Sequence, residues 1–122
     1  MNRSIKVKRV VPDGYTYARR SCTVFALALA LDVDFNDSEK YLISKGLKNG
    51  SLYSLPVWRE LFGYEKVIFC NTSITKALQK YNKGVFIFHK TKHVFCVKDG
   101  VILDRRKKMG KNIIIDYIVD CN

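Results

Sequence analysis

The sequence has little proline, no long apolar run and no room for a second domain. With two prolines and 48% hydrophobic residues, the 122-residue chain is expected to form one compact domain over residues 1–122. The longest apolar run, Thr23 to Leu31, is about half of what a membrane crossing requires. We therefore expect a buried helix there and no membrane partner.

Leader and metal-binding patterns are also missing. The opening MNRSIKVKRV contains no continuous apolar region, so we expect no signal peptide and a cytoplasmic location. In a reducing cytosol the cysteines are expected to be thiols. They are far apart and form no CxxC pair: Cys22, Cys70, Cys96 and Cys121. We therefore expect no cofactor and no zinc site, even with help from His89 and His93.

Acidic residues are scarce beside basic ones. The chain carries 22 Lys and Arg against 11 Asp and Glu, a formal net charge of +11. This balance favours acidic partners, which include nucleic acid, phosphorylated molecules, anionic surfaces and acidic proteins. Charge alone does not choose among them.

Helix signals dominate the first two thirds of the chain. Residues 22–31 predict an apolar helix capped by Ser21. NDSE predicts a second helix with Asn36 as its cap, running to about Lys45. SLPVWRELFG predicts a short third helix, and SITKALQKY a fourth.

Strand signals dominate the rest. An N-terminal edge strand, a strand at 66–70 and four strands after Gly84 are predicted. Helices mostly precede the strands, so the expected class is α+β, with N-terminal helices packed on a mostly antiparallel C-terminal sheet.

The segment HVFCVKDGVILD predicts a tight hairpin. Asp-Gly between two β-rich runs favours a two-residue type I′ turn. In that register Lys98 pairs with Val101, and His93 becomes a diagonal neighbour of Asp104 on one face. A carboxylate beside an imidazole fixes its tautomer and stabilises its protonated form.

Cys22 stands at the start of the apolar helix, behind the sequence RRS. A thiol at a helix N-terminus is shifted toward thiolate by the helix dipole and the unpaired N–H groups. Cys22, His93 and Asp104 therefore have the types and chain order of a nucleophile, a base and an orienting acid.

RRSCTVFALALALDVDF followed by KHVFCVKDGVILD resembles small papain-like cysteine-peptidase-fold proteins encoded by bacteriophages. The resemblance covers the first helix, the second helix and the hairpin. It implies a papain-like fold, with Cys22 as nucleophile, His93 as general base and Asp104 as the residue that orients it. It also implies a thiol-protease type of hydrolase (a peptidase, isopeptidase or amidase) acting on a peptide or protein inside a phage-infected host cell, without a cofactor.

The chain departs from that family in three places. Ser21 replaces an acidic residue before the cysteine, and Lys92 replaces a glycine before the histidine. No Gln or Asn lies just before Cys22 to stabilise an oxyanion. The backbone N–H of Cys22 is the first candidate for that role, and the side chains of Thr16 and Tyr17 are the alternatives.

Basic residues are expected to flank the site. They are Arg19, Arg20, Arg105, Arg106, Lys107, Lys108 and Lys111. They suit an acidic substrate or a phosphate backbone. Two classes of function therefore remain: a papain-like cysteine hydrolase, and a non-catalytic papain-fold module whose basic surface binds an acidic host protein or nucleic acid.

Overall fold

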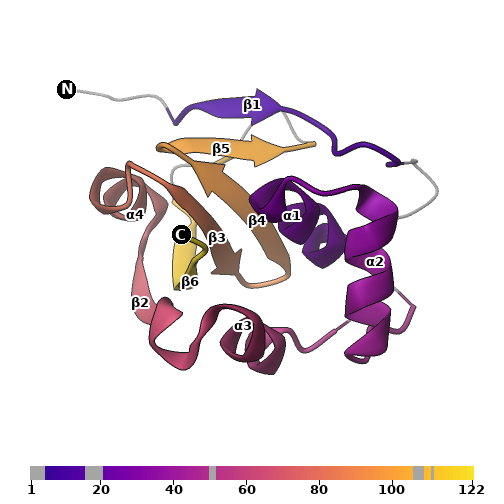
Figure 1. The fold of residues 1–122 in the computed structure, drawn as a ribbon. Helices are drawn as coiled ribbons and strands as arrows, with labels where there is room; N and C mark the ends of the chain where they lie inside the picture. The colour runs from indigo at the N-terminus through magenta and orange to yellow at the C-terminus, as the bar shows by residue number, and fades with distance from the viewer. Residues whose placement is uncertain (1–4, 16–20, 50–51, 106–108, 111) are drawn as a thin grey trace.

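The chain folds into helices and one mixed sheet in a computed structural model that describes all residues except 1–4, 16–20, 50–51, 106–108 and 111 (Figure 1). The helices of the described part are α1 (Cys22–Leu31), α2 (Phe35–Ser44), α3 (Leu55–Phe62), the 3₁₀ helix η1 (Tyr64–Lys66) and α4 (Ile74–Lys80). The strands are β1 (Val7–Arg9), β2 (Val67–Ser73), β3 (Val85–Lys90), β4 (His93–Lys98), β5 (Val101–Asp104) and β6 (Ile114–Asp120). The predicted α+β class is confirmed.

In the described part of the chain, the sheet has six strands in the order β1-β5-β4-β3-β6-β2. The pair of β1 and β5 is parallel, and the other four described pairs are antiparallel. The N-terminal strand β1 forms one edge, as predicted. The sheet is thus mostly antiparallel. Its strand β1 precedes all the described helices in the chain, whereas the other five strands follow α3.

The β4–β5 hairpin has the predicted register. Lys98 pairs with Val101 and Cys96 with Leu103. Asp99 and Gly100 have φ angles of 51° and 77°, both in the left-handed region, as a type I′ turn requires. This turn fixes which residues of the two strands lie opposite each other.

Helix α1 lies at the centre of the first core. The side chain of Ser21 caps it by accepting a hydrogen bond from the backbone N–H of Val24 at 3.3 Å, as predicted. Val24, Ala26 and Leu27 have no solvent exposure. The helix packs against β4 and α2, and burying each large apolar side chain contributes about 1.5–3 kcal/mol, so its first residue is firmly anchored.

The predicted cap of the second helix is wrong. Asp34, not Asn36, caps α2, because its carboxylate accepts a hydrogen bond from the backbone N–H of Asn36 at 2.7 Å. Asn36 lies inside the first turn. The sequence VDFNDSE contains several side chains that can cap a helix. The capping-box pattern favours Asn36, which lies too far along the chain.

The two faces of the sheet have separate cores. Helices α1, α2 and α3 cover one face over Ile87, Val94 and Val119. Helix α4 packs on the other core, and Figure 1 shows it apart from the other three. Among the described residues, no helix is long and apolar enough to span a membrane.

Candidate active site

Cys22 is the first residue of α1, where the helix meets the sheet. Its side chain is half-buried. Ser21 holds the start of the helix with its hydroxyl on Val24 and its carbonyl oxygen, which accepts from the N–H of Phe25 at 3.0 Å. The thiol therefore sits at a fixed point beside the positive end of the helix dipole.

His93 and Asp104 form a buried pair at the end of β4 and β5. Nε2 of His93 lies 2.8 Å from Oδ2 of Asp104, and the residues are 5% and 2% exposed. The other carboxylate oxygen of Asp104 accepts from the backbone N–H of Arg105 at 2.8 Å. The imidazole also stacks on Phe95, with ring centroids 5.7 Å apart.

This pair determines the tautomer of His93. The Asp104 carboxylate accepts a hydrogen bond, so Nε2 carries the proton. In the neutral ring Nδ1 is then unprotonated, and it is the nitrogen left to interact with the thiol of Cys22. A base with its lone pair on Nδ1 is the form that can remove a proton from a thiol.

The pKa values of the two groups shift toward an ion pair. Burial raises the pKa of the Cys22 thiol, but hydrogen bonding to His93 and to the backbone of Val94, with the charge of His93, outweighs it and leaves the pKa lowered. Burial lowers the pKa of His93, but hydrogen bonding to Asp104 and Cys22 leaves it raised. Each group therefore favours the charged form of the other.

The other three cysteines behave in the opposite way. Burial raises the pKa of Cys96 to about 12, and it also raises the pKa values of Cys121 and Cys70. Cys22 is thus the one cysteine of the four whose surroundings favour thiolate, the reactive form of the side chain.

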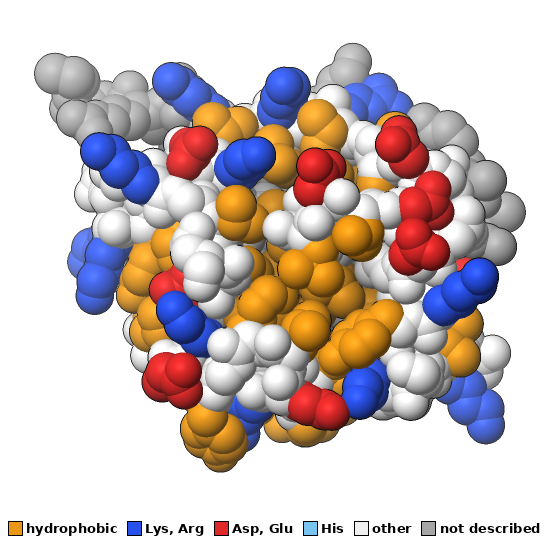
Figure 2. Space-filling view, in the orientation of Figure 1, with side chains coloured by type: hydrophobic (Ala, Val, Ile, Leu, Met, Phe, Trp, Pro, Cys, Tyr) orange, Lys and Arg blue, Asp and Glu red, His pale blue; other side chains and the backbone are white. Residues whose placement is uncertain are grey.

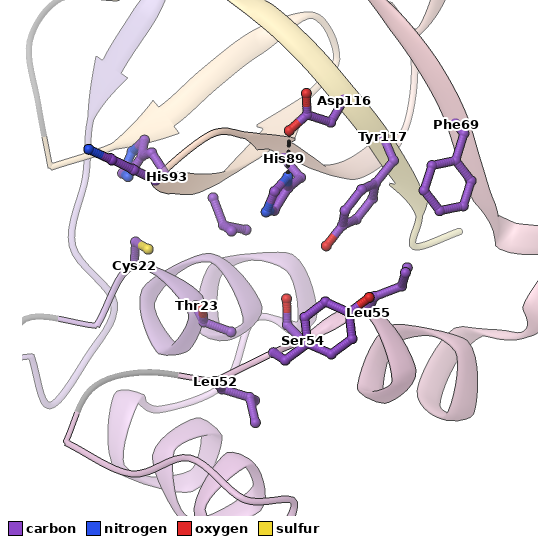
Figure 3. Close-up of a pocket in the computed structure, with 13 residues that line it drawn as sticks. Cys22, Thr23, Leu52, Ser54, Leu55, Phe69, His89, His93, Asp116 and Tyr117 are labelled. Carbon is purple, nitrogen blue, oxygen red and sulfur yellow. Dashed lines mark hydrogen bonds and ion pairs between the residues drawn. The ribbon is translucent and has the colours of Figure 1, made fainter.

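An open cleft of about 400 Å³ begins at Cys22. Figure 3 shows His93, His89, Tyr117 and Phe69 along the side formed by the sheet, and Cys22, Thr23, Ser54 and Leu55 along the side formed by the helices. Leu52, Tyr53, Lys92, Val94 and Asp116 complete the lining. The volume lies in the range of ligand-binding pockets.

His89 and Asp116 form a second pair in this cleft, which the sequence did not indicate. Nδ1 of His89 lies 3.2 Å from Oδ2 of Asp116. The sequence predicts an ordinary histidine here, because a spacing of four residues from His93 on strand and loop backbone creates no metal-binding face. Only the pairing of β3 with β6, His89 opposite Tyr117, brings the two residues together.

Several predicted site residues lie outside the described part of the chain. They are Thr16, Tyr17, Arg19, Arg20, Arg106, Lys107, Lys108 and Lys111. Arg105 is described, and its Nη1 donates a hydrogen bond to the hydroxyl of Tyr15 at 3.3 Å. Arg105 lines a small cavity together with Cys22, His93 and Asp104, so the basic segment starts beside the site.

Within the described residues, no three His, Cys, Asp or Glu side chains gather into a group that could hold a metal ion. Comparisons with protein-family models, curated proteins and solved structures find no match to this chain.

Proposed function

We propose that the protein is a papain-like cysteine hydrolase that cleaves a peptide, isopeptide or related amide bond. The observation that carries the proposal is the tautomer of His93: its Nε2 is bound to Asp104, which leaves Nδ1 for the Cys22 thiol at a helix N-terminus. The resemblance of the two sequence motifs to phage-encoded papain-like proteins supports the same reading and suggests action inside an infected cell.

The reaction would proceed in two halves. The Cys22 thiolate attacks the carbonyl carbon, and a bond from Sγ to that carbon forms. His93, protonated at Nδ1, gives its proton to the leaving amine as the C–N bond breaks, which leaves a thioester. Water then loses a proton to Nδ1 and attacks the thioester, so that Cys22 is released with the carboxylic acid product.

Two further groups stabilise the charges that develop during the reaction. Asp104 holds the imidazole in place and stabilises its protonated form. The backbone N–H of Cys22, at the start of α1, is the proposed donor to the oxyanion of the tetrahedral intermediate.

The direct test is alkylation of the four cysteines by iodoacetamide as a function of pH, with each site quantified by mass spectrometry. Cys22 is expected to react fastest near neutral pH, with a midpoint below that of an ordinary thiol. His93→Ala should move that midpoint upward, because the main interaction that lowers the pKa is lost. Equal rates at Cys22 and Cys121, unchanged by His93→Ala, would rule out an activated nucleophile.

Turnover needs a second measurement. With p-nitrophenyl acetate, a functioning site should release p-nitrophenol in a burst and leave an acetyl group on Cys22. Cys22→Ala is the control, and it should abolish both signals. Without the burst, the site would have an activated thiol but no acyl transfer.

The net charge of +11 supports a second candidate, a papain-fold module that binds an acidic host protein or nucleic acid. On the face shown in Figure 2, described Lys and Arg side chains lie among acidic ones around an apolar centre, so that view gives no patch of one sign. Retention on heparin or DNA across a salt series tests this candidate. Absent or salt-insensitive retention excludes the nucleic-acid version.

A further inference from the structure

The second His-Asp pair lies in the same cleft as Cys22 and His93. His89 belongs to β3, and Asp116 and Tyr117 belong to the neighbouring strand β6. Figure 3 shows the His89 ring between His93 and Tyr117, with a dashed line to Asp116. The side chains of His89 and Asp116 are 29% and 41% exposed, so solvent and a ligand can reach them.

The surroundings of His89 hold its ring firmly. The imidazole stacks on Tyr117 with centroids 4.4 Å apart and planes 8° apart. Tyr117 is itself buried, with 6% of its surface exposed. Asp116 fixes the in-plane rotation of the imidazole through Nδ1. A binding group held in this way loses little conformational entropy when a ligand arrives.

Asp116 also sets the tautomer of His89. The carboxylate accepts a hydrogen bond from Nδ1, so in the neutral ring Nε2 is an acceptor. Among the residues that the structure describes, none hydrogen-bonds to this Nε2. The cleft therefore contains one oriented acceptor in addition to the His93 pair.

We propose that His89 binds the substrate by accepting a hydrogen bond at Nε2 from a backbone amide N–H of a peptide chain. The inference rests on the proposed function, because it assumes that the cleft beside Cys22 holds the substrate. The ligand class is a peptide with at least one amide N–H beyond the reacting carbonyl. An isolated acyl group or a simple primary amide lacks the group that His89 recognises.

Charge favours an N–H group over an anion at this point. Asp116 places a carboxylate beside His89, and it repels an acidic substrate group there. The cleft is also longer than the reacting bond, since it extends from Cys22 to Phe69 on β2. A volume of about 400 Å³ accommodates more than one amino-acid residue.

The test uses an acetyl-tripeptidyl fluoromethyl ketone, which labels a thiolate by forming an S–C bond as fluoride leaves. In matched probes, each internal amide N–H is replaced in turn by an ester oxygen. For the unmodified protein, one replacement should slow labelling of Cys22 about 5-fold, the effect of one lost hydrogen bond of about 1 kcal/mol.

His89→Phe keeps a ring on Tyr117 but removes the acceptor. In this variant the ester and amide probes should label Cys22 at equal rates. His89→Gln, whose side-chain carbonyl can accept, should restore part of the difference and covers the case in which Phe is not tolerated. The same ester penalty in the unmodified protein and in His89→Phe, or no penalty in either, would overturn the inference.

Asp116 acts through His89, as a positioning residue. Asp116→Ala should reduce the amide preference by weakening probe binding, while the maximal labelling rate at saturating probe stays unchanged. Asp116→Asn, whose Oδ1 can still accept from Nδ1, should retain the preference. Iodoacetamide needs no peptide contact and should label Cys22 equally in all these proteins. Slow iodoacetamide labelling of Cys22 in the unmodified protein would instead contradict the proposed function.

Discussion

Nε2 of His93 lies 2.8 Å from Oδ2 of Asp104, inside the protein, on two strands joined by a two-residue turn. The pair lines a small cavity together with Cys22.

Asp104→Asn should destabilise the fold more in acid than in alkali. Its hydrogen bond raises the pKa of His93 in the folded state, so protonated His93 stabilises the fold below the pKa that histidine has when unfolded. This contribution is lost as the pH rises through the folded-state pKa. Urea unfolding should show a difference of about 1.5–3 kcal/mol near pH 5 and a smaller one near pH 9. A larger difference in alkali would contradict the raised pKa.

Ser21→Ala should lower the free energy of unfolding by about 1 kcal/mol, because the cap of α1 is lost. It should also slow alkylation of Cys22, since the helix start positions the thiol. Ser73→Ala is a matched control: Ser73 caps α4 through Lys76, also at 3.3 Å, in the other core. It should cost similar stability without changing alkylation of Cys22.

Lys92→Gly should be more stable than Lys92→Ala by about 1 kcal/mol. Lys92 has a φ of 66°, a left-handed conformation that glycine adopts without strain. Both substitutions remove the charge next to His93, so thermal unfolding of the pair isolates the backbone effect. Lys90, in β3, is the control position, where Gly should be less stable than Ala.

Cys22 and Cys96 should respond differently to serine. Cys96 is fully buried, and a hydroxyl there should cost about 1–3 kcal/mol. Cys22 is half-buried at a helix start, so Cys22→Ser should change the unfolding free energy by less than about 1 kcal/mol. Chemical denaturation of the two variants measures both. A large loss from Cys22→Ser would favour a structural role for that thiol.

Local signals were sufficient for much of the fold. Ser21 predicts the start of α1, and Asp99-Gly100 predicts the register of β4 and β5, because both effects act between residues close in the chain. The His93–Asp104 pair follows from that register. The α2 cap failed at Asn36 because neighbouring residues compete for the same backbone N–H groups.

The order of the strands in the sheet could not be predicted from local sequence patterns. That β6 lies between β3 and β2 depends on packing between distant segments, and no short pattern encodes it. The second histidine pair in the cleft was missed for this reason: His89 and Asp116 are 27 residues apart in the chain.

The place of β6 has a consequence for biosynthesis. This strand follows the other five in the chain, yet it occupies an inner position of the sheet. On the ribosome, β2 and β3 cannot pair with β6 until β6 has emerged, and such non-local pairing forms slowly. Helix α1 can form early, but the sheet face that it packs against is completed only after β6 has emerged. A nascent chain would therefore expose its thiol before the cleft around it had formed.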